Sequence, residues 1–397
     1  MKKLLLCTLL AVLAAAAPIG AQTLPQGIGE PIPDAETNPE GILVENATLD
    51  AVLLLEGGDE PGAFALLDSL DRSGSTDAAV QYYLGLLNYS RGDMDEAAQR
   101  LERATQLDTA NTWYCETLAN FYVATGEGAK AGGIFAGLAE RDPLKFRNVY
   151  TLSLIADAYR LKRDYDNFFA TLTAIVTDEY TEDEIKYKAV MGAVGNFDKR
   201  TLDAIMPRID TLALRYTEAE PRSLRSHGMR LETSGLLRNY LVVLDECFTL
   251  MDLDPGDTDL NVRCLSIIGD SLHEMGDNRT AYKYYEKALR LDPRNCPVLN
   301  NYAYFLSLER KRLCKAERMS RITIEEEPDN ATYLDTYGWI LFLRGKAAKA
   351  KPHFKHAMLY GGKDSAVVLK HYSLVLKALG ENELATYYEN LSESKSK

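Results

Sequence analysis

The sequence predicts an all-α protein in which pairs of helices stack into a solenoid, and three observations support this fold class. From about Asn46 onward, apolar residues recur at helical spacing in segments separated by short turns that carry Gly, Asp, Asn or Pro. Small residues come in pairs twelve positions apart, as in Gly338 with Ala350 and Gly269 with Ala281. These pairs recur every 34 or 35 residues, and such a period indicates a repeat protein.

Residues 1–22 have the pattern of a secretory signal peptide. Two lysines precede an apolar run that begins at Leu4, and a helix-breaking proline and small residues follow it. The run is short for a membrane span, so we expect cleavage near Ala21 or Gln22 and export of a mature chain without a membrane span. Residues 23–43 are rich in proline and glycine, and we expect an extended leader without a core of its own.

The paired small residues belong to a motif that recurs along the chain. In its closest copy, Leu334, Gly338 and Leu341 precede Ala350 and Phe354. A small residue, an alanine and a large apolar residue recur at the same offsets in three further copies: Gly269, Ala281 and Tyr285; Gly85, Ala97 and Leu101; Ala119, Ala131 and Phe135. This pattern resembles the tetratricopeptide repeat, in which helix A carries W-x2-L-G-x2-Y and helix B carries A-x3-F.

The resemblance implies a right-handed superhelix, an α-solenoid, of about nine helix-turn-helix units. Six units are clear and three are degenerate: 78–111, 112–145, 262–295, 296–330, 331–364 and 366–397 are clear, and 44–77, 149–182 and 224–257 are degenerate. Residues 183–223 match poorly but have the pattern of two amphipathic helices. We therefore expect N-terminal repeats at 44–182, a divergent helical pair at 183–223 and C-terminal repeats at 224–397.

Gly338 is the position where the repeat pattern makes the sharpest packing prediction. In the resemblance it lies where helix A meets helix B of its own unit, and a side chain there would push the two helices apart. Packing therefore explains this glycine better than the approach of a ligand to the backbone does.

The resemblance also implies a concave face built from helix A positions that stay out of the core. Aromatic residues are frequent at these positions, and both tryptophans of the chain fall among them. Aromatic anchors beside polar side chains suit the recognition of a peptide or protein, although single aromatics could instead pack against the neighbouring helix. The predicted groove residues are Trp113, Glu116, Asn120, Asn300, Tyr304, Asp335, Trp339 and Phe342. The Lys and Asn set with which some family members grip a chain terminus is not reproduced.

Charge is distributed unevenly along the mature chain. Residues 23–277 hold 22 Lys and Arg against 44 Asp and Glu, whereas residues 278–363 hold 17 against 9. The basic residues expected on the helix B side, from Arg310 to Lys355, form either a solvated face or a surface for an acidic partner, an anionic lipid or the acidic part of another copy. Nucleic acid is not an expected partner, given the export signal, the acid excess and the lack of a recognised motif.

No motif in the sequence predicts catalysis, a metal site or a cofactor. His353 and His356 lie close together but outside an HExxH setting, and there is no GxSxG, Walker or Rossmann fingerprint. Five cysteines follow residue 22, and their odd number and wide spacing favour buried free thiols, with a single disulfide left open.

The sequence thus predicts a non-catalytic scaffold of the bacterial cell envelope, periplasmic or peripherally attached to the envelope, that binds a protein or peptide in an aromatic-lined groove. Two alternatives stay open. One is a periplasmic chaperone or assembly factor for exported clients, and the other is an envelope accessory that binds glycan along the same groove.

Overall fold

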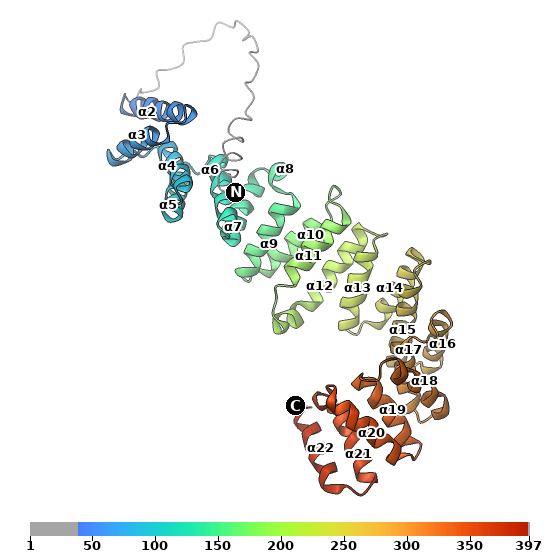
Figure 1. Ribbon diagram of the computed structural model, residues 1–397. Coiled ribbons are helices and arrows are strands. Elements are labelled where there is room, and N and C mark those ends of the chain that lie inside the picture. The colour runs from blue at the N-terminus through green and yellow to red at the C-terminus, as the bar shows by residue number, and fades with distance from the viewer. Residues whose placement is uncertain (1–38, 396–397) are drawn as a thin grey trace. The chain divides into compact units, whose positions relative to one another are not determined.

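All regular elements in the described part of the chain are helical (Figure 1). The structure is a computed structural model that describes residues 39–395, and this range contains 21 α-helices and one short 3-10 helix. The predicted all-α class is confirmed. The predicted signal peptide, residues 1–22, lies outside the described residues, as does the predicted leader as far as residue 38.

The first described helix, α2 (Pro39–Glu56), begins inside the segment 23–43 that the sequence analysis assigns to an extended leader. Proline is tolerated at the start of a helix because the first N–H groups have no partner within the helix. Helical structure therefore begins before the expected first unit at residue 44.

The chain divides into two units by its internal contacts. Unit 1 comprises the described residues up to Thr181 together with Lys188–Gly195, and unit 2 comprises Glu182–Tyr187 and the residues from Asn196 onward. Besides α2, unit 1 contains α3 (Glu60–Arg72), α4 (Ala78–Arg91), α5 (Met94–Leu107), α6 (Thr112–Ala124), α7 (Gly128–Arg141), α8 (Pro143–Phe146), α9 (Val149–Leu161) and α10 (Tyr165–Val176). Helix α11 (Asp183–Val194) contributes residues to both units.

Unit 2 continues with the same kind of helices. They are α12 (Lys199–Ala219), α13 (Leu224–Leu236), α14 (Tyr240–Leu253), α15 (Thr258–Glu274), α16 (Asn278–Leu291), α17 (Cys296–Leu308), α18 (Leu313–Glu326), α19 (Ala331–Leu343), α20 (Ala347–Leu359), η1 (Gly362–Asp364), α21 (Ala366–Ala378) and α22 (Asn382–Lys395). The segment 183–223, expected as a divergent helical pair, contains α11 and α12.

Successive helices pack as hairpins, and neighbouring hairpins stack within each unit. The pairs are α2 with α3, α4 with α5, α6 with α7 and α9 with α10 in unit 1, and α13 with α14, α15 with α16, α17 with α18, α19 with α20 and α21 with α22 in unit 2. These nine pairs, next to α11 and α12, agree with the expected number of about nine repeats.

The turn between the two helices of each pair carries at least one residue with a left-handed backbone, and the turn between α17 and α18 carries two, Arg310 and Arg312. Glycine holds this position in six pairs, because it adopts positive φ without a Cβ clash: Gly58, Gly92, Gly126, Gly276, Gly345 and Gly380. In the other three pairs Arg163, Arg238 and Arg310 adopt φ of 58°, 57° and 53°. A left-handed residue is therefore kept in every pair, although the glycine signal is lost in three of them.

The small residue of helix A lies directly against helix B, as the sequence predicts for Gly338. A Cβ placed on Gly338 would lie 2.7 Å from Cε2 of Phe354, which is fully buried. The equivalent distance is 2.7 Å from Gly269 to Tyr285 and 2.8 Å from Gly85 to Leu101. The packing interpretation of Gly338 is confirmed, and the partner in each pair is the large residue four positions after the motif alanine.

The five cysteines after residue 22 are free, but not all of them are buried. Cys247, Cys264 and Cys296 are buried, Cys115 is half-buried and Cys314 is exposed. The expectation of buried thiols is wrong for Cys314, because this residue occupies the first turn of α18, two positions before Ala316, which faces the core.

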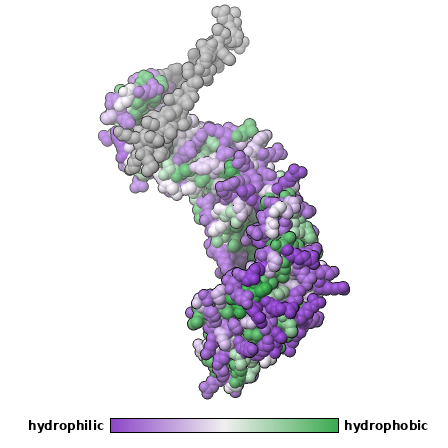
Figure 2. Space-filling view, turned by 45° about the vertical axis from the view of Figure 1, so that its right-hand side comes forward, coloured by the Kyte–Doolittle hydropathy of each residue, from purple (hydrophilic) through white to green (hydrophobic). Residues whose placement is uncertain are grey.

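The face of the described part that Figure 2 presents is mainly hydrophilic. Figure 2 shows polar side chains over most of the visible face, with separate hydrophobic patches between them. No described helix combines the length and the apolar composition needed to cross a bilayer. Among the described residues, no group of three or more His, Cys, Asp or Glu side chains could hold a metal ion.

Candidate functional site

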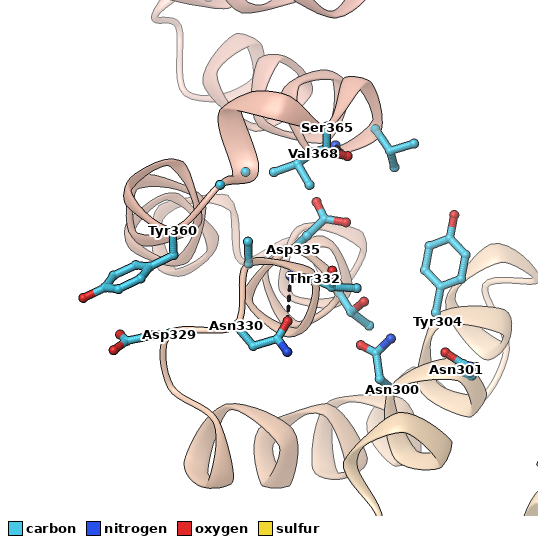
Figure 3. Close-up of a pocket in the computed structure, with 15 residues that line it drawn as sticks. Asn300, Asn301, Tyr304, Asp329, Asn330, Thr332, Asp335, Tyr360, Ser365 and Val368 are labelled. Carbon is cyan, nitrogen blue, oxygen red and sulfur yellow. Dashed lines mark hydrogen bonds between the residues drawn. The ribbon is translucent and has the colours of Figure 1, made fainter. Parts of the chain in front are cut away.

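A cavity of about 670 Å³ opens in unit 2 among the A helices of three successive repeats, α17, α19 and α21 (Figure 3). This volume is within the range of ligand-binding pockets. Fifteen residues line the cavity: Asn300, Asn301 and Tyr304 from α17; Asp329, Asn330, Ala331, Thr332, Asp335 and Thr336 from the start of α19 and the turn before it; and Tyr360, Gly361, Gly362, Ser365, Val367 and Val368 from the segment that leads into α21.

Helix caps fix the positions of the lining side chains. The Asn330 side chain accepts hydrogen bonds from the backbone N–H groups of Thr332 and Tyr333 at 3.1 and 3.3 Å, which starts α19 at this point. Ser365 caps α21 in the same way, accepting from the Val368 N–H at 3.4 Å. Both helices therefore begin at the cavity, and the side chains of their first turns line it.

Asp335 is held by a histidine from the next repeat. His371 Nδ1 donates to the two carboxylate oxygens of Asp335 over 2.9 and 3.1 Å, and both residues are buried. The Trp339 ring stacks on His371 with centroids 4.0 Å apart and on Phe342 at 5.3 Å. Helices α19 and α21 are thus joined by a polar contact between Asp335 and His371, and Trp339 of α19 stacks on the same histidine.

The asparagines of α17 have different surroundings. Asn301 donates to the Asp270 carboxylate at 3.3 and 3.4 Å, and Asp270 also accepts from the Tyr285 hydroxyl. Burial raises the pKa of Asp270 in spite of these two donors. Asn300 is only 5 % exposed, and its Oδ1 has no hydrogen-bond partner. Figure 3 shows the Asn300 side chain directed from α17 into the cavity.

Tyr304 is the aromatic side chain that α17 contributes to the cavity. It is half-buried, and burial raises the pKa of its hydroxyl, with the negative charge of Asp335 raising that pKa further. The hydroxyl therefore stays protonated at neutral pH and can both donate and accept a hydrogen bond.

The structure brings together three of the eight predicted groove residues in this cavity, namely Asn300, Tyr304 and Asp335. Trp339 and Phe342 lie further along α19, and the Trp339 Nε1 is buried without a hydrogen-bond partner. Trp339 packs against the core of its repeat, so at least part of its role is structural.

The other three predicted groove residues lie on α6 in unit 1. Trp113 is 39 % exposed, and its Nε1 donates to the Tyr82 hydroxyl at 2.8 Å. Glu116 pairs with Lys145 at 2.6 Å, and Asn120 is exposed. The eight predicted residues therefore divide between the two units, and their assignment to one continuous groove stays a prediction.

Several lining residues escaped the sequence analysis, above all the segment Tyr360 to Ser365. This segment carries Gly361 with φ 96° and the short helix η1 before the Ser365 cap. Two signals in the sequence could have found it: the Gly-Gly pair, and the step of 35 instead of 34 residues between Ala350 and Ala385. An extra residue in a repeat is accommodated in a loop, where it can shape a binding face.

Part of the predicted basic surface joins neighbouring repeats. Lys315 of α18 pairs with Glu286 of α16 at 2.8 Å and also donates to Tyr302. Lys346 pairs with Glu317 of α18 at 3.0 Å, and Lys351 of α20 pairs with Glu381. These side chains are thus occupied within the protein, whereas Arg318 and Lys355 are exposed.

Comparisons with known proteins identify tetratricopeptide repeats in both units. Tetratricopeptide repeat models match residues 89–153, 262–295 and 284–317. No curated protein matches the chain. Proteins built from this repeat in general serve as scaffolds that bind proteins or peptides, and the matched repeats suggest an interaction scaffold.

Three solved structures that match the chain share little of its sequence, and their TM-scores lie below 0.5. "Structure of Naa15/Naa10 bound to HypK-THB" is 15 % identical over 89 % of this chain and 64 % of that chain, with a TM-score of 0.40. This chain therefore spans less than two thirds of that protein's length. "MamA MSR-1 C2" is 15 % identical over 43 % of this chain and 94 % of its own, with a TM-score of 0.34. "MamA RS-1 ArsTM double mutant" is 14 % identical over 49 % and 94 %, with a TM-score of 0.33.

Proposed function

We propose that the protein is a non-catalytic scaffold of the bacterial cell envelope that binds an extended segment of a partner protein in the cavity among α17, α19 and α21. The observation that carries the proposal is the cavity itself, which gathers side chains from three successive repeats. A stack of repeats presents such a surface without further elements, because each repeat adds one helix A to the same face.

The lining has the chemistry that an extended peptide requires. Polar side chains such as the Asn300 amide and the exposed Thr332 hydroxyl can form hydrogen bonds with the N–H and C=O groups of a peptide backbone. The Tyr304 ring and the exposed Val367 side chain supply apolar contact beside them. A segment of a few residues fits the volume of about 670 Å³.

The location in the cell envelope rests on the sequence. Residues 1–22 have the composition of an export signal, and export would bring the repeats to the periplasm. The exposed basic side chains on helix B, such as Arg318 and Lys355, suit a peripheral attachment to an acidic surface.

A displayed library of random peptides of about twelve residues, screened against the chain from Thr23 onward, tests the binding function. We expect enrichment of a defined consensus. The variants Asn300→Ala and Tyr304→Ala should each weaken binding of a consensus peptide at least about tenfold, which corresponds to about 1.4 kcal/mol. Arg318→Ala is the matched control, because this exposed side chain lies on α18 away from the cavity lining.

The same screen separates the alternatives. A chaperone would enrich many unrelated apolar peptides without a consensus, and a glycan-binding accessory would enrich none but bind envelope polysaccharide. If Arg318→Ala and Asn300→Ala lose binding equally while both keep the wild-type melting temperature, the cavity is not the binding site.

A further inference from the structure

We infer that the cavity selects a cationic group of the bound segment, namely the ammonium or guanidinium group of a Lys or Arg side chain. This inference rests on the proposed function, because it names the ligand chemistry of the same site. The inference is argued from the hydrogen-bond acceptors that line the cavity and from the negative charge of its two carboxylates.

The first argument is the charge of the lining. Among the fifteen described residues that line the cavity, Asp329 and Asp335 carry carboxylates, and none is Lys or Arg. This contrasts with the sequence around the cavity, since residues 278–363 hold 17 Lys and Arg against 9 Asp and Glu. The cavity is therefore an acidic spot within a basic part of the chain, and an anionic ligand would meet no cationic side chain in it.

The second argument is an acceptor without a donor. Asn300 is 5 % exposed and points into the cavity, yet its Oδ1 accepts no hydrogen bond (Figure 3). A buried acceptor without a hydrogen-bond partner costs free energy. Its presence therefore favours a ligand that can donate an N–H group. An ammonium offers three donors and a guanidinium five, and neither is an acceptor.

The third argument concerns the histidines beside the two carboxylates. His371 contacts Asp335 through Nδ1, and His356 contacts Asp329 through Nε2 at 2.9 Å. A neutral imidazole donates one proton, which orients a carboxylate without removing its negative charge. Each carboxylate also keeps acceptor lone pairs that a bound ammonium or guanidinium group can use.

The helix dipoles act in the opposite direction but are weaker. The N-termini of α19 and α21 each bring roughly half a positive charge to the cavity. The Asn330 and Ser365 side chains already accept from the free N–H groups there. Two carboxylates outweigh these partial charges, so the cavity keeps a net preference for a cation.

The test is calorimetric titration of the chain from Thr23 onward with end-blocked heptapeptides of alanine and asparagine that carry Lys, Gln or Glu at the central position. We expect the Lys peptide to bind at least about tenfold more tightly than the Gln peptide, and the Glu peptide to bind most weakly. The preference for Lys should shrink when NaCl rises from 50 to 500 mM, because salt screens charges. A Gln peptide with a free amino terminus shows whether a terminal ammonium serves equally well.

Two variants locate the effect. Asp335→Asn should remove most of the preference for Lys over Gln, and Asp329→Asn should reduce it without disturbing the buried contact with His371. Asp364→Asn is the matched control, since this exposed carboxylate lies on η1 but does not line the cavity. The inference is overturned if all three peptides bind alike, or if the Glu peptide binds best, while the proposed function stands. If neither these peptides nor any library consensus binds, the proposed function fails and the inference fails with it.

Discussion

At Gly338 the backbone of α19 and the ring of Phe354 in α20 leave no room for a side chain. Phe354 is fully buried and also stacks on Tyr372 of the next repeat, with ring centroids 5.6 Å apart. It therefore cannot move aside without disturbing a second hairpin. The crossing of the two helices therefore requires a small residue at this position of the motif. A larger side chain there should destabilise the protein strongly.

We predict that Gly338→Ala destabilises the protein by about 2 kcal/mol, because the new methyl group overpacks this crossing. Gly228→Ala in α13 is the matched control, because a Cβ there would have no atom within 4 Å. That substitution should instead stabilise by about 0.5–1 kcal/mol through the better helix propensity of alanine. Urea unfolding followed by circular dichroism measures both. Similar effects of the two substitutions would contradict the packing assignment.

At the scale of the helices, ion pairs between repeats fix how one hairpin sits on the next. Glu317 of α18 is the most connected of these groups, since it contacts Arg321 on its own helix and Arg344 and Lys346 in the turn between α19 and α20. Its side chain is 7 % exposed. Removing one partner of such a cluster leaves the remaining charges unpaired in a partly buried environment, which destabilises the fold.

We predict that Glu317→Gln costs about 2 kcal/mol at pH 7, less than for a fully buried pair because Arg344 and Lys346 keep contact with water. Burial raises the pKa of Glu317, but hydrogen bonds from Lys346 and Arg344 and their charges outweigh burial, so its pKa lies below the ordinary 4.5. A lowered pKa in the folded state stabilises the protein above the unfolded-state value, and this stabilisation is lost as pH falls through the folded value.

The difference between wild type and Glu317→Gln should therefore be constant above about pH 5.5 and shrink as pH falls below 4.5. Chemical unfolding at a series of pH values measures it. Glu325→Gln is a control on the same helix, because Glu325 is exposed. A difference that grows toward acid pH would show that the cluster does not hold Glu317 ionised.

At the scale of the whole chain, the helices divide between two compact units. Each repeat packs mainly on its neighbours, so that unfolding of a stack can begin in one part and stop at a weak junction. The two tryptophans of the chain fall one in each unit, Trp113 in unit 1 and Trp339 in unit 2. They are natural reporters of the two parts.

We predict that the variants Trp113→Phe and Trp339→Phe, each with one remaining tryptophan, report different unfolding midpoints in guanidinium chloride. The two fluorescence curves should bracket the broader curve obtained by circular dichroism, because helix content averages over both units. Coincidence of all three curves would show that the units unfold as one cooperative body.

The sequence by itself determined the class of fold, the repeat and its internal packing. Gly338, Ala350 and Phe354 lie within one hairpin, so the contacts they make depend on local spacing that the sequence displays directly. The same holds for the turn, where a glycine signals the left-handed residue in most repeats. Where Arg163, Arg238 or Arg310 takes that position, the glycine signal is absent although the residue still adopts a positive φ.

Only the tertiary structure decided which candidate residues meet. Asn300, Asp335 and Ser365 come from three successive repeats and line one cavity. Their meeting depends on contacts between repeats, which the motif does not describe. Pairing of Asp335 with His371, 36 positions away, has the same origin, because a repeat pattern fixes the position of a side chain within its unit but not its partner in the next one.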